Sequence, residues 1–374
     1  MGQPVVQRKR QPELDVIRIF AFCGIVWLHC LNYTGFYTLL PDTPGYLPAL
    51  TVRTMLSAAV PLFIMLTGYL LCEKPVPIHP LKGLGKILLI YVLTCIPSYF
   101  FRQIEEEGYY LSPAGILWTI LDYSLNHYGW YVGMYIGLYL LAPYLNILHR
   151  GLDRQGNRRL LMLLFVLIAL PTLTNTMHFF SMEFWRHPST AGPDTYNRLL
   201  PEFWQKLPYP LLYYGMGAYV KHYPPRARAR TLLGLFLGAG ILFSVYNLWR
   251  LDGRTYYADS WSDLYGFQAT VLTPLAFCLL ERFFAGRIRR GKTVRLLTRI
   301  SGLVLGASLL SYCSDMILYR VLNLADRFSS FRKALLFSPL LVLASALLAL
   351  LMSVPVTGLV QAAMGRISGK TERK

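Results

Sequence analysis

The sequence predicts an all-α, polytopic integral membrane protein with about ten transmembrane helices. Of its 374 residues, 54% are apolar or aromatic and only 15% are charged, whereas a soluble domain carries roughly a quarter charged residues. Long apolar stretches recur along the whole chain, and Lys and Arg gather in the gaps between them. The net charge of +18 therefore indicates loops at a bilayer surface, and we expect no nucleic-acid partner.

Ten apolar stretches approach the roughly 20 residues that a bilayer-spanning helix needs. The shortest is 207–221, and the apolar segment 112–125 predicts a partly inserted helix before the fourth span. The ten predicted spans are 14–34, 54–72, 84–101, 127–147, 159–177, 207–221, 231–249, 264–284, 300–320 and 334–354. The chain thus divides into an N-terminal arm (1–13), a membrane domain (14–356) and a basic tail (357–374).

The distribution of charge predicts how these spans are oriented. One set of alternate loops, together with both termini, carries more than twice as many Lys and Arg residues as the other set. Because basic residues resist translocation, we expect both termini in the cytoplasm. The loop with Arg327, Arg332 and Lys333 is the exception. The six cysteines show neither CxxC nor His-linked spacing, so we expect no metal site.

The first span holds four polar residues, Asp15, Arg18, His29 and Asn32, in an otherwise apolar segment. At 100° per residue, Arg18 and His29 lie within about 20° of one face and about 16 Å apart along the axis. Alone, Arg18 is explained as an anchor paired with Asp15, and His29 as a core histidine bonded to a neighbouring helix. Their shared face instead predicts a cavity lined by both, in which a neutral imidazole can take a proton from a hydroxyl.

Three blocks together resemble the membrane-bound acyltransferase 3 family. They are Leu14-Asp15-x-x-Arg18 followed by His29, the VPLF...TG run over 60–71, and the spacing of Trp130, Tyr139 and Pro143. The resemblance covers essentially all ten spans. Tyr214-Gly215-Met216 and Ala258-Asp259-Ser260-Trp261 resemble the branch that includes the O-acetyltransferase of enterobacterial common antigen. The family moves acyl groups, most often acetyl from acetyl-CoA, onto hydroxyls of sugars and other acceptors.

The chain departs from the family pattern at two places. Lys82 and Lys86 stand where relatives commonly carry R-x-x-R, and lysine attracts phosphate without arginine's bidentate fork. In the ninth span, Ser308 and Ser311 occupy positions where tyrosine and histidine are expected. Asp315 in the same span needs a partner, and we expect Arg320 or Arg18 to supply it.

The resemblance implies an acyl-CoA-dependent O-acyltransferase of a bacterial inner membrane, acting on a cell-envelope glycan or glycolipid. His29 would be the general base, with Arg18 and Asp15 on the same face. Acetyl-CoA would bind basic residues that alternatively serve only as topology determinants: Arg18, Lys82, Lys86, Arg150 and Arg158. The acceptor or the oxyanion would contact Asn32, Tyr69, Trp130, Tyr131, Asp259 and Ser311. Direct transfer and a covalent acyl-histidine both remain open. The alternative functions are a transporter or flippase and a catalytically altered binding or sensing relative.

Overall fold

The computed structural model describes residues 11–75, 83–106, 108–190, 192–201, 208–289 and 291–371, with no description of the side chains of residue 193 and of 366–371. Over these residues the chain is helical and contains no β-strand. Nine helical segments of the described part are long and apolar enough to cross a membrane. The prediction of an all-α, multi-pass membrane protein is therefore confirmed.

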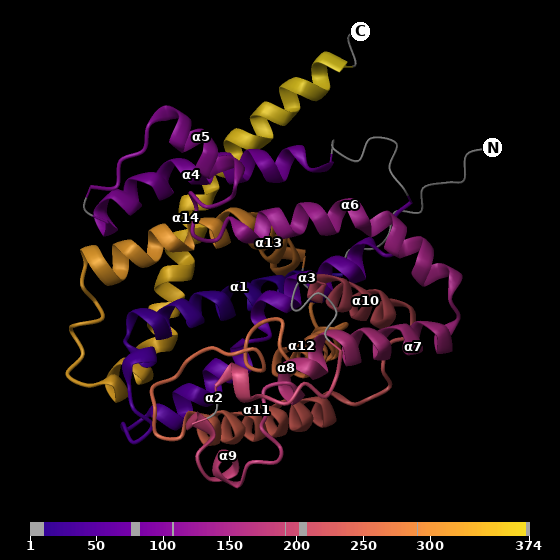
Figure 1. The fold of residues 1–374 in the computed structure, drawn as a ribbon. Helices are drawn as coiled ribbons and strands as arrows, with labels where there is room; N and C mark the ends of the chain where they lie inside the picture. The colour runs from indigo at the N-terminus through magenta and orange to yellow at the C-terminus, as the bar shows by residue number, and fades with distance from the viewer. Residues whose placement is uncertain are drawn as a thin grey trace.

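Figure 1 shows the helices and the loops that join them. In order they are α1 (Pro12–Tyr33), α2 (Tyr46–Leu56), α3 (Ala59–Leu71), α4 (Gly85–Glu105), α5 (Pro113–Leu121), α6 (Trp130–Gly151), α7 (Arg154–Leu164), α8 (Leu170–Thr174), α9 (Met182–Arg186), α10 (Tyr209–His222), α11 (Ala229–Leu251), α12 (Phe267–Phe284), α13 (Gly291–Asp315) and α14 (Phe331–Thr371). Two π-helical segments, Phe165–Ala169 and Met316–Val321, continue α7 and α13.

The predicted sixth span differs from the other nine. It corresponds to α10, which has 14 residues and is therefore only about 21 Å long, against a hydrocarbon core of about 30 Å. Half of its residues are buried, and it packs closely against α3. It is consequently an internal helix of the bundle. The segment predicted to insert partly is α5, whose residues Leu117 and Trp118 are exposed.

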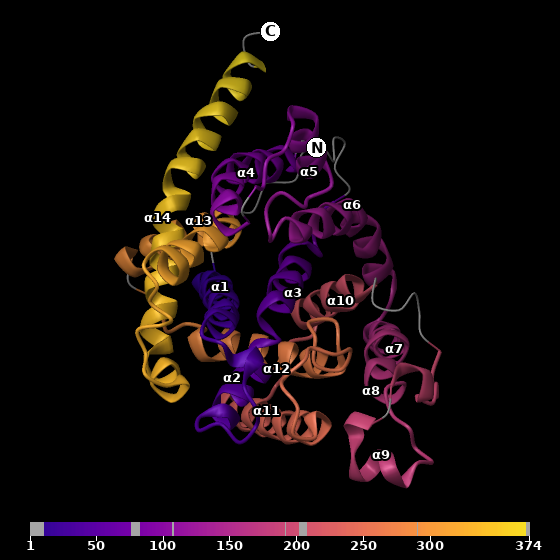
Figure 2. The same ribbon diagram turned by 60° about the vertical axis from the view of Figure 1, so that its left-hand side comes forward.

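The helix α1 lies in the middle of the bundle and packs against α3, α12, α13 and α14. Figure 2 shows α13 and α14 on one side of α1 and α3 on the other. Its buried side chains, such as Ile17, Phe22 and Val26, join core clusters with these neighbours. A polar residue on α1 therefore faces protein on most sides, so that its partners come from these neighbouring helices.

Two glycines let α3 and α10 approach each other closely. A Cβ on Gly68 would overlap the backbone of Tyr214, and one on Gly217 would overlap the backbone of Met65. The close crossing holds α3 in place, and α3 supplies one wall of the cavity described below. At the end of the chain, α14 is one helix of 41 residues. The boundary expected at 356/357 thus falls within a continuous helix.

Candidate active site

A cavity of about 450 Å³ lies among α1, α3, α4, α6 and α13. Its walls are mostly apolar, and its polar side chains come from all five helices and from the loop before α6. The side chains with a polar group are Arg18, His29, Thr67, Lys86, Tyr128, Trp130, Tyr131, Tyr135, Ser301 and Ser308. Arg18 and His29 therefore line the same cavity, as their spacing on one helix face predicts.

Arg18 lies toward the N-terminal end of α1, where it joins α1 to α13. Its Nη1 donates a hydrogen bond of 2.7 Å to Ser301 Oγ and lies 3.7 Å from Asp15 Oδ1. Lys86 contributes a second positive charge from the start of α4. The cavity wall therefore carries two cations, which suit a group with phosphates.

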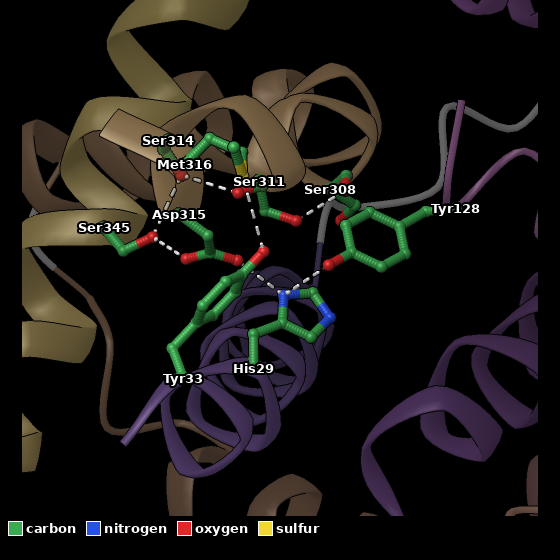
Figure 3. Close-up of polar contacts among 9 residues, drawn as sticks. All are labelled: His29, Tyr33, Tyr128, Ser308, Ser311, Ser314, Asp315, Met316 and Ser345. Carbon is green, nitrogen blue, oxygen red and sulfur yellow. Dashed lines mark hydrogen bonds and ion pairs between the residues drawn. The ribbon is translucent and has the colours of Figure 1, made fainter. Parts of the chain in front are cut away.

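His29 lies about three turns further along α1 and is held by a buried carboxylate of α13. Its Nδ1 is 2.9 Å from Asp315 Oδ2, and Asp315 is fully buried. Ser345 of α14 donates to the other carboxylate oxygen over 2.7 Å, and Ser314 lies 2.9 Å from Ser345. Figure 3 shows this chain of contacts on one side of the imidazole.

The contacts of Asp315 determine which imidazole nitrogen carries the proton. An ionised carboxylate only accepts hydrogen bonds, so we assign the proton to Nδ1, which donates to Asp315. The lone pair then lies on Nε2, for which no hydrogen-bond partner is found within the described ranges. A histidine held in this way is arranged to accept a proton at Nε2 from a molecule in the cavity.

Tyr128, from the loop before α6, fixes the plane of the His29 ring. The two rings stack with centroids 4.4 Å apart and planes inclined by 7°. The Tyr128 hydroxyl also lies 3.2 Å from His29 Nδ1. With Asp315 at one edge and Tyr128 across one face, the imidazole has little freedom to rotate.

The comparison with known families agrees with this geometry. A family model described as acyltransferase domain matches residues 11–357. The chain belongs to the acyltransferase 3 family. Searches of curated proteins and of solved structures gave no significant match. The match includes α1 and α13 and hence both members of the His29–Asp315 pair, so the pair lies inside the acyltransferase domain.

The pairing of Asp315 corrects one expectation from the sequence. We expected Arg18 or Arg320 as its partner, but Arg18 bonds Ser301 and His29 takes this place. The reason is the register of two neighbouring helices. Asp315 lies 14 residues after Ser301 on α13. At 100° per residue this is a rotation of about 1400°, roughly 40° short of four full turns, so both side chains project from nearly the same face.

Five residues of this acyltransferase were predicted to bind the acyl-CoA donor. Of these, Lys86 and Arg18 line the cavity, whereas Lys82 lies outside the described residues. Arg150 instead donates to the backbone carbonyls of Cys72 and Lys74, where α3 ends. It thereby satisfies acceptors that a helix terminus leaves open. Arg158 is an exposed residue of α7 and is not part of the cavity wall.

Of the six residues predicted to contact the acyl acceptor or the oxyanion, only some line the cavity. Trp130 and Tyr131 line the cavity, whereas four others lie elsewhere. Tyr69 packs on Phe277 below the Lys221 ammonium. The other three also lie outside the cavity wall. They are exposed Asn32, Asp259 in the loop between α11 and α12, and buried Ser311, which donates to the Ser308 carbonyl. The acyltransferase thus uses several of these polar residues for its own architecture.

Sequence reasoning did not predict either of the two residues that contact His29 at this acyltransferase site. Tyr128 lies in a loop, where no helical period indicates its direction. The role of Asp315 has a signal in retrospect, because Ser301, Ser308 and Asp315 recur every seven residues on α13. Over the described part of the chain, no group of three or more His, Cys, Asp or Glu side chains is arranged to hold a metal ion.

Proposed function

We propose that this acyltransferase moves an acetyl group from acetyl-CoA to a hydroxyl of a cell-envelope glycan or glycolipid, in a bacterial inner membrane with both termini in the cytoplasm. The observation that carries the proposal is the His29–Asp315 pair in the wall of a cavity whose other end holds Arg18. This pair supplies a base that can activate a hydroxyl.

The donor would enter at the basic end of the cavity. Arg18 and Lys86 would attract the phosphates of CoA, which is made in the cytoplasm, and the excess of Lys and Arg supports a cytoplasmic position for this end. The distance along α1 from Arg18 to His29, about 16 Å, is about the reach of a pantetheine arm. The mostly apolar walls between them suit the uncharged arm and thioester.

The acetyl transfer would occur in one displacement at His29. The imidazole Nε2 takes the proton from the acceptor hydroxyl as the oxygen attacks the thioester carbonyl carbon, which gives a tetrahedral oxyanion. The C–S bond then breaks, and the CoA thiolate takes the proton from His29. Asp315 stabilises the imidazolium formed between these two steps. No net proton is gained or lost, so His29 is ready for another turnover.

The acceptor would be a hydroxyl-bearing glycan, in keeping with the sequence likeness to the enterobacterial common antigen branch. Trp130, which is 42% exposed, and Tyr131 offer aromatic surface at the cavity wall for a sugar ring. The family assignment favours this acyltransferase over the transporter and flippase alternatives. The His29–Asp315 pair favours a catalytic protein over a binding or sensing relative.

The proposal is tested with protein purified in detergent by measuring acetyl-CoA binding, slow acetyl-CoA hydrolysis and acetyl transfer to envelope glycan fragments. We expect His29→Ala to lower turnover by about 10²- to 10⁴-fold, as is typical for loss of a general base. His178→Ala is the matched control, since His178 lies in an outer loop outside the cavity wall. Retained turnover in His29→Ala, or wild-type protein without affinity for CoA, would show the proposal to be wrong.

A further inference from the structure

The hydroxyl of Ser308 is a buried donor without a partner. Its Oγ is shielded from solvent and makes no hydrogen bond. Of the buried side-chain N and O atoms left unpaired in the described part of the chain, it is the one whose residue lines the cavity. Since nearly all buried polar groups are paired, an unpaired one calls for an explanation, and a ligand bound in the cavity that Ser308 lines would supply a partner.

Neighbouring serines on α13 show that the local backbone offers an alternative. Ser311 and Ser314 both donate to the carbonyl three residues earlier in the helix, at 2.8 and 3.0 Å. Ser side chains in helices commonly bond back in this way. Ser308 does not make this bond, and its residue lines the cavity. Since no hydrogen bond holds the hydroxyl, rotation about χ1 can turn it toward a molecule bound there.

Along α13, Ser308 lies midway between the two residues that contact Arg18 and His29 of α1. On α13 it is seven residues from both Ser301, which binds Arg18, and Asp315, which binds His29. It thus sits between the proposed phosphate end and the proposed base. In the view of Figure 3, Ser308 lies on the Tyr128 side of the site, and Asp315 lies on the opposite side.

We propose that Ser308 Oγ donates a hydrogen bond to the carbonyl oxygen of the donor thioester and to the oxyanion that forms from it. The inference rests on the proposed function and adds a catalytic residue to it. Ser308 keeps its proton throughout, while His29 carries the acceptor's proton to the CoA thiolate. The negative charge that develops on oxygen strengthens the hydrogen bond, and this lowers the barrier.

The test uses two variants of nearly equal shape, Ser308→Thr and Ser308→Val, of which only the first retains a hydroxyl. We expect kcat for acetyl transfer and for acetyl-CoA hydrolysis to be about 10²- to 10³-fold lower in Ser308→Val than in Ser308→Thr, as for loss of one oxyanion donor. The KM for acetyl-CoA should be similar in both. If the extra methyl group of threonine or valine disturbs folding, Ser308→Ala replaces Ser308→Val, because it also lacks the hydroxyl and adds no bulk. Its kcat is then compared with that of wild type, and the same loss is expected. Ser244→Ala, which removes a buried hydroxyl bonded to its own helix on α11, is the control.

A second measurement reports on the hydrogen bond itself. Acetonyl-CoA carries a ketone in place of the thioester and cannot transfer its acyl group. The infrared carbonyl stretch of bound acetonyl-CoA should lie at lower frequency in wild type and Ser308→Thr than in Ser308→Val. A change in helix packing alone would not produce this pattern.

The outcomes separate the inference from the proposed function. Wild-type activity lost in His29→Ala but equal in Ser308→Thr and Ser308→Val would overturn the role of Ser308 and leave the acyltransferase intact. An acetyl group found covalently on Ser308 after incubation with acetyl-CoA would also overturn it, since Ser308 would then be a nucleophile. Wild-type protein that neither binds nor cleaves acetyl-CoA would overturn both proposals.

Discussion

Replacing Asp315 by asparagine removes the charge that orients His29 while almost preserving the shape of the side chain. In wild type, Asp315 accepts from His29 Nδ1 over 2.9 Å and from Ser345 over 2.7 Å. If the asparagine oxygen faces Ser345, its amide group points at Nδ1 and forces the proton to Nε2. The imidazole then has no lone pair for the acceptor. If the oxygen faces His29, the ring keeps its tautomer but loses the negative charge that stabilises the imidazolium.

The size of the effect follows from these two contacts. A hydrogen bond to a charged group contributes about 1.5 to 3 kcal/mol, which corresponds to a factor of about 10 to 150 in rate. The wrong tautomer adds to this loss, as in the Asp-to-Asn change of a serine protease triad, which lowers kcat by about 10⁴. We therefore expect Asp315→Asn to lower kcat by roughly 10²- to 10⁴-fold, with little change in the KM for acetyl-CoA.

The assay is steady-state acetyl transfer, with acetyl-CoA hydrolysis measured in parallel on the same preparations. Asp326→Asn, in an exposed loop, is the matched control. Ser345→Ala should cost less, because it removes one donor to the carboxylate and leaves the charge. His29→Ala combined with Asp315→Asn should be no slower than His29→Ala, since the two residues act as a unit. A folded Asp315→Asn protein with wild-type kcat would refute the reasoning.

Neutralising Arg18 or Lys86 by alanine should raise the KM for acetyl-CoA, more for Arg18 because it is less exposed than Lys86 and makes the hydrogen bond to Ser301. Titrations at low and high salt should show a weaker salt dependence in each variant; a change in kcat alone would place the phosphates elsewhere. Gly68→Ala should lower the melting temperature in detergent, because the new methyl group overlaps the α10 backbone and overpacking costs about 1 to 3 kcal/mol. Gly137→Ala, where a Cβ meets open space, is the control, and equal melting temperatures for the two variants would contradict this account of the α3–α10 crossing.

Much of the fold follows from the composition and order of the residues. Apolar runs of about 20 residues have few solutions other than membrane helices, because a bilayer leaves backbone groups no partner outside a helix. The sequence also placed Arg18 and His29 on one face of α1, since helical period is a local property. It also predicted a membrane span at 207–221. The structure has α10 there, a helix of only 14 residues that is packed inside the bundle.

The tertiary structure alone decided what meets His29. The contact between His29 and Asp315 joins positions 286 residues apart, and no local period specifies which helix packs beside α1 or in what register. The same packing separates Ser308, which faces the cavity, from Ser311, which bonds its own helix. Residue type predicted which side chains have the chemical groups to accept a proton or bind a phosphate. Helix packing determined which of them share a cavity, because a side chain acts only on groups within a few ångströms of it.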